Sequence, residues 1–307
     1  MSFSRITTLM TQSQILGEVN QSQNALAKTE QELSTGKTIN APSDNPYGAA
    51  LAVQLNGQLS QLTDYNNNIT DGQAWTQTAT SSLSAIQEQV QRAQELVTEA
   101  ANGSENTSDL NDIGEELTQI VSSIQTDANA QYNGQYVFSG TSTSTPPYDS
   151  SGSYLSGGTF SPVTRAIGPN ASATVSVDIS QALGSNISSS SSGSGLLSQI
   201  SQIAANLSGS TPDTSTLSSD LSQLQTGLNS LGTLQTQLGT STDQMTMAAS
   251  TISDMQTSVT SDLSNDEDAN MAQTMTTYSS EQAAFTAALQ AGASIVQTSL
   301  MNFLSNG

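Results

Sequence analysis

Apolar residues recur with heptad spacing along two long stretches of the chain, and each stretch predicts one long helix. In the first, every seventh position from Leu55 to Val97 reads Leu, Leu, Ile, Thr, Leu, Val, Val, and a companion set begins at Leu51. In the second, every seventh position from Leu217 to Val259 reads Leu, Leu, Leu, Leu, Met, Ile, Val. The companion set there begins at Leu221, and steps of four and three residues form a coiled-coil seam. We predict two rods of matching length, about 70–75 Å each.

Polar or small residues interrupt both long seams. Gln58 and Gly72 fall in the first seam, and Gln235, Thr242 and Gln256 fall in the second. Each such position is expected to weaken the pairing of two helices, because it removes an apolar contact from the seam.

Shorter seams lie at both ends of the chain, and a helix of medium length follows the first rod. The N-terminal seam consists of Leu9, Leu16, Val19, Leu26 and Leu33, and the C-terminal one of Met271, Met275, Tyr278, Phe285, Leu289, Val296 and Phe303. The medium helix is marked by Leu110, Ile113, Leu117, Ile120 and Ile124. This nearly palindromic order predicts a chain that runs out and returns, so that its first half pairs with its last.

The terminal seams are the poorest in apolar residues, since Gln, Ser and Glu30 alternate with them. Ordering a residue costs about 1–2 kcal/mol, which these seams alone do not offset. Neighbouring copies that supplied more apolar partners would reverse the balance. We therefore expect a helical assembly subunit whose ends become ordered on association.

The predicted fold is mainly α, a long antiparallel coiled coil or helix bundle formed by both halves of the chain, with a small β-rich insertion. We expect a terminal helical pair of residues 1–40 plus 272–307, a long-helix bundle of 41–139 plus 196–271, and an outer insertion of 140–195. The insertion is rich in Gly and Pro, and residues 159–163 and 173–179 alternate as half-exposed strands do. We expect it to project into solvent, with the serine run 188–192 as a linker.

Start and stop signals predict where the helices begin and end. Asp44 or Asn45 before Pro46 forms an N-cap followed by proline at the first helical position, and 211–213 repeats that signal. Gly36 fits a left-handed C-terminal cap of the first helix. Thr107 or Ser108 is expected to open the medium helix.

The composition excludes several classes of function. The chain has no His and no Cys, so ordinary zinc sites, His-based triads and thiol nucleophiles are excluded. Five Lys and Arg against 26 Asp and Glu give a net charge of -21, which argues against nucleic-acid and anionic-membrane partners. No run of 18 apolar residues occurs, and residues 1–8 lack the apolar core of a cleaved signal peptide.

Three short motifs resemble active or metal sites, and each has a simpler interpretation. Gly36-Lys37-Thr38 matches the end of a phosphate-binding loop, but the glycine required five residues earlier is Gln31. Ser34 with Lys37, followed by 43–45, resembles two serine β-lactamase motifs at the wrong spacing. Residues 266–270 offer alternating oxygen ligands without the glycine and glutamate of a calcium loop. We expect these acids to lie at the start of the last helix.

The remaining candidates favour packing over binding. Tyr65 and Tyr278 fall on seams, so we expect core packing for them. Arg92 lies at helical neighbour spacing from Glu88 and Glu95 and predicts a weak surface ion pair. We predict no catalytic, metal or cofactor-binding residues and no enzymatic activity.

Both ends of the sequence resemble bacterial flagellins and their relatives. The N-terminal signature spans 31–46 and reads QELSTGKTINAPSDNP. The C-terminal resemblance lies in 264–272 and 290–304. Asn45 replaces the acidic residue usual in the family, which is a conservative change at a helix cap.

Residues 128–140, ANAQYNGQYVFSG, resemble the branch of that superfamily that joins the flagellar hook to the filament. The resemblance implies a structural adaptor that forms a ring of identical subunits between another hook-associated junction protein and the flagellin filament. It also implies export through the flagellum's own channel, assisted by a chaperone, to an extracellular position at the hook–filament junction. In that role the terminal seams form the assembly interface, formed by Leu9, Leu16, Val19, Leu26, Leu33, Met275, Tyr278, Phe285, Leu289, Val296 and Phe303.

Two alternatives stay open at this point. One is a flagellin-type filament subunit, against which the sequence of residues 136–140 argues. The other is a secreted enzyme that uses Ser34 and Lys37.

Overall fold

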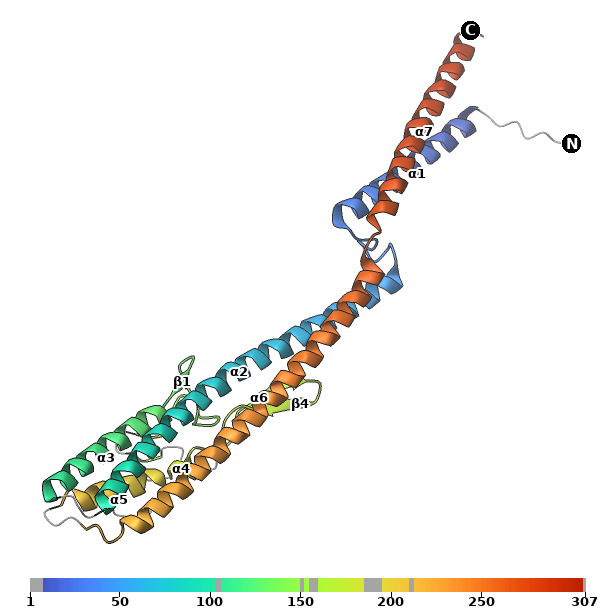
Figure 1. The fold of residues 1–307 in the computed structure, drawn as a ribbon. Helices are drawn as coiled ribbons and strands as arrows, with labels where there is room; N and C mark the ends of the chain where they lie inside the picture. Colours follow the sequence, from blue (N-terminus) through green and yellow to red (C-terminus); the bar gives the residue numbers. More distant parts are fainter. Residues whose placement is uncertain are drawn as a thin grey trace. The chain divides into compact units, whose positions relative to one another are not determined.

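The computed structural model describes residues 8–102, 106–149, 152–154, 160–184, 195–209 and 213–305. The helices in these ranges are α1 (Thr8–Thr35), α2 (Pro46–Ala101), α3 (Thr107–Ala128), α4 (Ser180–Leu183), α5 (Leu196–Leu207), α6 (Leu217–Glu267) and α7 (Met271–Ser305). The strands are β1 (Gln131–Tyr132), β2 (Gln135–Tyr136), β3 (Thr164–Gly168) and β4 (Ala171–Thr174) (Figure 1). They form two antiparallel pairs, β1 with β2 and β3 with β4. The predicted mainly α fold with two long helices is confirmed.

The chain divides into two compact units. We call residues 1–61 with 256–307 the terminal unit and residues 62–255 the central unit. The boundary falls inside α2 and α6, and the three-part division expected from the sequence stays a prediction.

The first predicted seam is a buried stripe along α2. Every position of the set from Leu55 to Val97 is buried, including Thr76 at 1% exposure. On α6 the set from Leu217 to Ile252 is buried, while its companion set from Leu221 is half-buried throughout. One heptad position of α6 therefore faces the core and the other lies at its margin.

Polar seam positions of α6 find specific partners on α2 in the central unit. The Gln235 amide donates to the Ser84 hydroxyl at 3.0 Å, and the Thr242 hydroxyl donates to that of Thr76 at 3.2 Å. The pairing shows that the helices are antiparallel. The Gln235–Ser84 hydrogen bond favours this register of the two helices, while the Thr242 hydroxyl also has a partner in its own helix, the Leu238 carbonyl at 2.9 Å.

Helices α3 and α5 complete the central unit. All five residues that predicted the medium helix are buried on α3. A Cβ at Gly114 would lie 2.2 Å from Ser208 Oγ, and one at Gly227 would lie 2.3 Å from Leu196, so α5 packs closely against both α3 and α6. Helix α5 was not predicted, although Leu196, Ile200, Ile203 and Leu207 repeat at helical spacing.

Strands β3 and β4 form a hairpin and do not coincide with the strands predicted at 159–163 and 173–179. The described residues 160–163 form no strand, and β4 overlaps the predicted 173–179 only at its first two residues. The Val175 amide still donates to the Val163 carbonyl at 2.9 Å, but the Val163 amide donates to the Ser176 hydroxyl, which ends the regular ladder. The turn uses Pro169 and Asn170, the latter at φ 61°.

The described part of 140–195 is packed, although we expected it to project into solvent. Apolar side chains that it buries include Tyr148, Val163, Ile167, Val175, Val177, Ile179 and Leu183. The alternation in 173–179, which suggested a half-exposed strand, does mark a buried face that consists of Ala173, Val175, Val177 and Ile179. The serine run 188–192 lies outside the described residues.

The helix signals were largely correct. Gly36 has φ 72° and caps α1, and the Asn45 side chain accepts from the Gly48 amide at 3.0 Å at the start of α2. Helix α3 begins at Thr107, one of the two predicted starts, and its N-cap is Asn106, which forms a capping box with Asp109. Helix α6 begins four residues after Asp213, while Thr211 and Pro212 lie outside the described residues.

Candidate assembly surface

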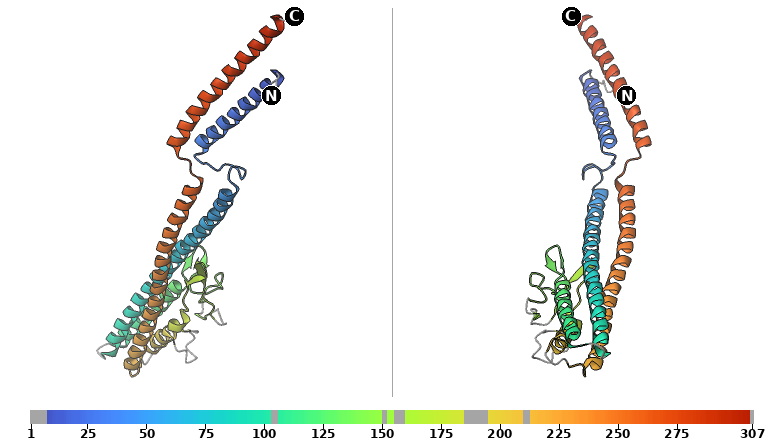
Figure 2. Two further views of the ribbon diagram at one scale, coloured as in Figure 1. Left: turned by 90° about the vertical axis from the view of Figure 1, so that its right-hand side faces the viewer. Right: turned by 60° about the vertical axis from the view of Figure 1, so that its left-hand side comes forward.

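Helices α1 and α7 form an antiparallel pair in the terminal unit. The Thr29 hydroxyl donates to the Glu281 carboxylate, and a Cβ at Gly292 would lie 3.2 Å from Ile15 Cγ2. Figure 2 shows the same two helices side by side from two further directions. The predicted pairing of the two chain ends is therefore present in the structure.

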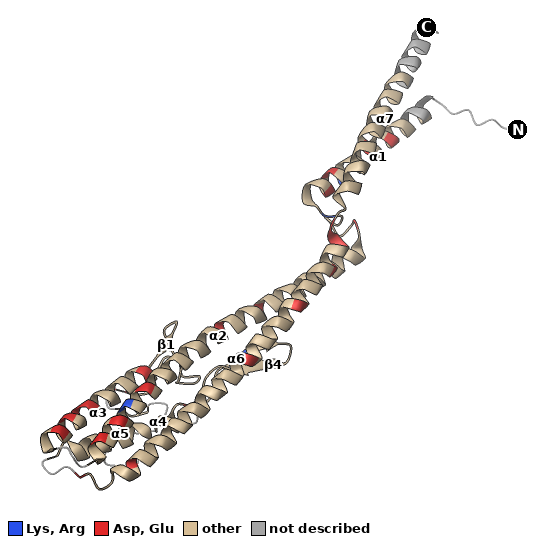
Figure 3. Ribbon diagram, viewed as in Figure 1, with Lys and Arg blue, Asp and Glu red and all other residues tan. Residues whose placement is uncertain are grey.

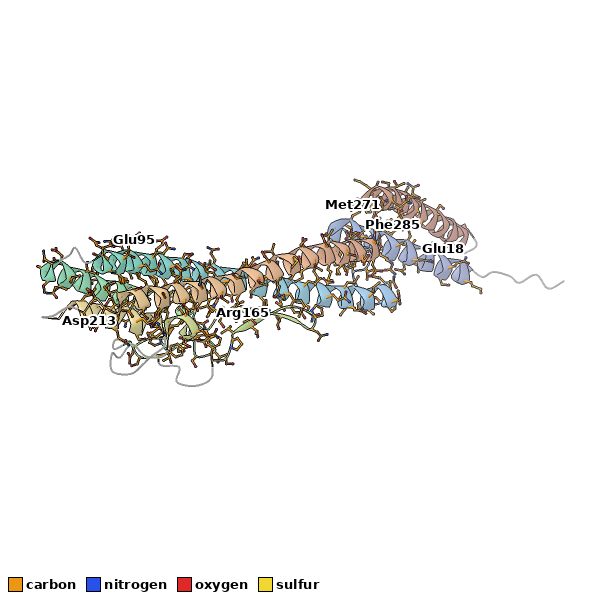
Figure 4. All side chains as sticks on the ribbon, turned by 60° about the horizontal axis from the view of Figure 1, so that its bottom comes forward. Glu18, Glu95, Arg165, Asp213, Met271 and Phe285 are labelled. Carbon is orange, nitrogen blue, oxygen red and sulfur yellow. The ribbon has the colours of Figure 1, made fainter. Side chains whose placement is uncertain are left out.

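This pair has almost no core of its own. Among the described side chains of α1 and α7, only Thr29 and Thr274 are buried, and both are polar. Large apolar side chains are instead exposed, among them Met10 at 65%, Leu16 at 58% and Met275 at 65%. Phe285 on α7 and Glu18 on α1 are labelled in Figure 4.

The predicted interface residues lie on these helices with different exposure. Leu16, Met275 and Leu289 are exposed, whereas the half-buried ones are Val19, Leu26, Leu33, Tyr278 and Phe285. Leu9, Val296 and Phe303 belong to the helices, but their side chains lie outside the described residues. The interface itself stays a prediction.

Because their apolar side chains are incompletely buried, the paired helices α1 and α7 are expected to be only weakly stable in isolation. Fully burying one Leu, Met or Phe side chain is worth about 1.5–3 kcal/mol, and here each retains a large part of its exposure. Ordering each residue costs about 1–2 kcal/mol. A surface that covered these side chains would supply the missing burial, as expected of an assembly interface.

Two short connectors meet at the base of the pair. The Thr38 amide donates to the Glu267 carbonyl at 2.7 Å, and the Ala269 amide donates to the Gly36 carbonyl at 2.8 Å. The Lys37 ammonium forms an ion pair with the Glu267 carboxylate. These contacts join 36–38 to 267–269, segments that are far apart in the sequence.

The acidic run 266–268 was expected to lie at the start of the last helix, and that expectation was wrong. Asp266 and Glu267 end α6, and α7 begins only at Met271. Asn270 caps α7 instead, since its carbonyl accepts from the Thr274 amide at 2.9 Å and its side chain from the Gln273 amide at 3.2 Å. No cluster of acidic side chains suited to a metal ion occurs in the part of the chain that the structure describes.

We call the contact between connectors 36–38 and 267–269 the joint. The motifs that resembled enzyme sites lie in or next to it. Gly36 caps a helix, Lys37 is held by Glu267, and Ser34 lies on the exposed surface of α1. Asp44 accepts from the backbone amides of Ala41 and Asn40, and these hydrogen bonds hold the pKa of its carboxyl below the ordinary value. These residues build the connector.

In the central unit, the motif 128–140 is buried at Ala128 and at residues 137–140, and exposed at the turn of β1 and β2. The Asn129 side chain makes two hydrogen bonds to the Tyr148 backbone, donating to its carbonyl at 2.8 Å and accepting from its amide at 3.0 Å. The Tyr148 hydroxyl donates to the Gly184 carbonyl at 2.6 Å, and burial raises the pKa of that phenol. Asn133 and Gly134, both at positive φ, form the two-residue turn of β1 and β2. The Asn-Gly pair was a readable hairpin signal that the sequence analysis missed.

Replacing Asn129 with Ala is expected to lower the free energy of unfolding by about 2–4 kcal/mol, because one buried amide and one carbonyl lose their partners. Urea denaturation followed by circular dichroism measures this loss. The matched control is Asn67→Ala at an exposed position on α2, with an expected change within about 0.5 kcal/mol. If the two variants lowered the free energy of unfolding equally, Asn129 would not be the residue that holds the Tyr148 backbone in place.

Trp75 joins α2 to the strands of the central unit. It is fully buried, packs edge-on to Tyr132 at 6.1 Å between ring centroids, and lies 5.7 Å from the Arg165 guanidinium carbon. Arg165, labelled in Figure 4, also pairs with Asp71 at 2.9 Å, and Asp71 lies one helical turn before Trp75. The tryptophan is therefore a packing residue.

Charged residues are unevenly distributed among the helices. Acidic residues gather over α3 and the adjoining end of α2, while α7 is almost entirely uncharged (Figure 3). Arg92 pairs there with Glu116 at 2.8 Å and with Glu95 at 3.3 Å, while the pair expected with Glu88 is absent from the described ion pairs. No described helix has the length and hydropathy that crossing a bilayer requires.

Comparison with known proteins points to flagellar components. Residues 6–143 match the family model of the bacterial flagellin N-terminal helical region. A flagellin of Salmonella muenchen is 34% identical over 128 residues, which cover 41% of this chain and 25% of the relative. A phase 1 flagellin of Salmonella naestved is 34% identical over 133 residues, covering 43% of this chain and 26% of the relative. The matched region thus spans about a quarter of the length of these curated relatives.

The fold is shared with solved flagellar proteins. A Vibrio parahaemolyticus protein assigned as a flagellar hook-associated protein superposes with a TM-score of 0.65 at 21% identity, covering 73% of this chain and 100% of that chain. Flagellar hook-associated protein-3 of Legionella pneumophila gives 0.60 at 14% identity, with 69% and 98% covered. FlgL of Bacillus cereus gives 0.57 at 18% identity, with 69% and 99% covered. The sequence resemblance to flagellins and their relatives is thereby confirmed: residues 6–143 match the flagellin N-terminal helical region, and the chain shares its fold with solved flagellar hook-associated proteins.

Proposed function

We propose that this protein is a structural adaptor of the bacterial flagellum, which joins the hook to the filament as a ring of identical subunits. The observation that carries the proposal is that the chain superposes on solved hook-associated proteins over 98–100% of their length, with TM-scores of 0.60–0.65. The exposed apolar side chains of α1 and α7 supply the means of assembly.

In this role the terminal helices bind the same helices of neighbouring subunits. Leu16, Met275 and Leu289, which are exposed in the single chain, become covered in the ring. A weakly charged contact surface is an advantage here, since copies that each carry a net charge of -21 repel one another elsewhere. The nearly uncharged α7 therefore suits contact between like-charged copies.

The partners on either side of the ring would be a second hook-associated junction protein and the flagellin filament. Before export the chain would be held by a chaperone, and its final location would be extracellular.

A binding experiment with purified components tests the adaptor role. Purified protein is added to isolated flagellar hooks that carry their first junction protein, and flagellin is then supplied. We expect a layer of fixed stoichiometry at the hook tip, and filament growth only from hooks that bear it. Electron microscopy with tip labelling measures both. Absence of tip binding would contradict the proposal.

The similarity to flagellins favours a second candidate, a filament subunit. The same preparation decides between the two. The adaptor is expected to stop after one layer at any concentration, whereas a filament subunit would grow long filaments without added flagellin.

A further inference from the structure

The connectors at the base of α1 and α7 carry a charged pair that the assembly role does not by itself require. Lys37 and Glu267 are 230 residues apart in sequence and form an ion pair, with 46% and 11% of their side chains exposed. The Glu267 carbonyl accepts from both the amide and the hydroxyl of Thr38, at 2.7 and 3.0 Å. Backbone and side chain of one residue are thus both held by the opposite connector.

Burial makes Glu267 dependent on this lysine. A carboxylate that is nearly excluded from water is costly unless it is paired, and breaking such a pair leaves an uncompensated charge. Its neighbours in sequence, Asp266 and Asp268, add like charge, and Asp266 Oδ2 is buried without a hydrogen-bond partner in the described structure. Lys37 is one of only five cationic residues in the chain, so replacements are scarce.

The backbone contacts alone form a weak joint. Lys37 and Asp268 form an isolated antiparallel bridge, and the Ala269 amide donates to the Gly36 carbonyl. The two backbone hydrogen bonds between the connectors contribute about 1–3 kcal/mol in all. The Lys37–Glu267 ion pair is therefore expected to be a substantial part of what holds the joint closed.

We propose that Lys37 and Glu267 form a latch that fixes the points from which α1 and α7 leave the connectors, so that the terminal helices are presented in the arrangement that neighbouring subunits bind. This inference rests on the proposed ring assembly. The latch is a pair of positioning residues, since neither side chain needs to touch a neighbouring subunit.

Charge reversal tests the latch. In Lys37→Glu, hydrogen exchange at the Thr38 and Ala269 amides of the monomer is expected to accelerate at least about tenfold, and hook-tip binding to weaken at least about tenfold. Glu267→Lys is expected to do the same. The double variant Lys37→Glu with Glu267→Lys restores the opposite charges, and we expect both quantities to return to within about threefold of the original chain.

Arg92→Glu is the matched control, because it makes the same charge change in the surface pair with Glu95 and Glu116 in the central unit. It is expected to leave the connector amides and tip binding unchanged. The latch would be overturned if Lys37→Glu did not accelerate hydrogen exchange at the connector amides. It would also be overturned if exchange accelerated but tip binding stayed unchanged, or if the double variant did not recover both quantities. Failure of the original chain to bind hooks would instead overturn the adaptor role, while the exchange measurements would still report on the joint.

Discussion

Ending the chain after Met271 is expected to abolish hook-tip binding while leaving the central unit folded. The truncation removes nearly all of α7 and with it the partner of α1, including Met275, Phe285 and Leu289. The apolar core from Leu62 to Ile252 belongs to the central unit and lies outside the deletion. We expect tip binding to fall below detection, by about a hundredfold or more, because each covered apolar side chain contributes about 1.5–3 kcal/mol.

Purified proteins are needed for this test, so that export does not limit the result. Tip binding is measured as above, and the thermal unfolding of the central unit is followed by circular dichroism. A chain that ends at Ser305, the last residue of α7, is the matched control and should bind normally. Normal binding by the shorter chain would show that α7 is not part of the interface.

Replacing Trp75 with Ala is expected to destabilise the central unit by about 3–5 kcal/mol. The change empties a fully buried site and removes contacts with Tyr132 and Arg165. Trp75→Phe should cost much less, about 1–2 kcal/mol, since it retains a ring and deletes an indole N–H that has no partner in the described structure.

Both variants are measured by urea denaturation followed by circular dichroism. Tryptophan fluorescence cannot follow either of them, because both remove the single Trp of the chain. Tyr47→Ala is the control, at an aromatic residue 79% exposed, with an expected change below about 0.5 kcal/mol. If Trp75→Ala were no more destabilising than Tyr47→Ala, the packing role of the tryptophan would be refuted.

Heptad spacing was sufficient to predict the long helices, because a repeating apolar contact along a rod is written locally in the sequence. Leu83 and Leu231 could be placed in the core from their register alone, and both are fully buried. Gly36 and Asn45 were equally predictable, since each cap depends on a few adjacent residues.

Contacts between distant segments were not predictable in this way. Lys37 was weighed as part of a phosphate loop or an enzyme site, because its partner Glu267 comes from the other end of the chain. The acidic run 266–268 was assigned to the start of α7, because acidic side chains generally stabilise a helix N-terminus. Asp266 and Glu267 instead end α6, and Glu267 pairs with Lys37. The alternation near Val163 predicted the burial of that residue correctly but predicted strand pairing there wrongly, since its amide donates to the Ser176 hydroxyl. A segment with one buried face has the same two-residue period whether or not it pairs with another strand.

The assembly interface could be predicted only as a set of positions on α1 and α7. Leu26 and Leu289 belong to one antiparallel pair, as the seams predicted. Their half-exposed state depends on what covers them, and no property of the single chain specifies that partner.

Thiol labelling tests the central claim most directly, because the natural chain has no Cys. Single variants Met275→Cys and Leu289→Cys place a thiol at positions 65% and 48% exposed on α7, and Asn229→Cys places one on the exposed surface of α6 in the central unit. Maleimide labelling is compared between the free chain and hook-bound protein. We expect the two α7 thiols to react readily in the free chain and at least about tenfold more slowly when bound, with position 229 reactive in both states. Equal labelling of the α7 thiols before and after binding would contradict assembly through the terminal helices.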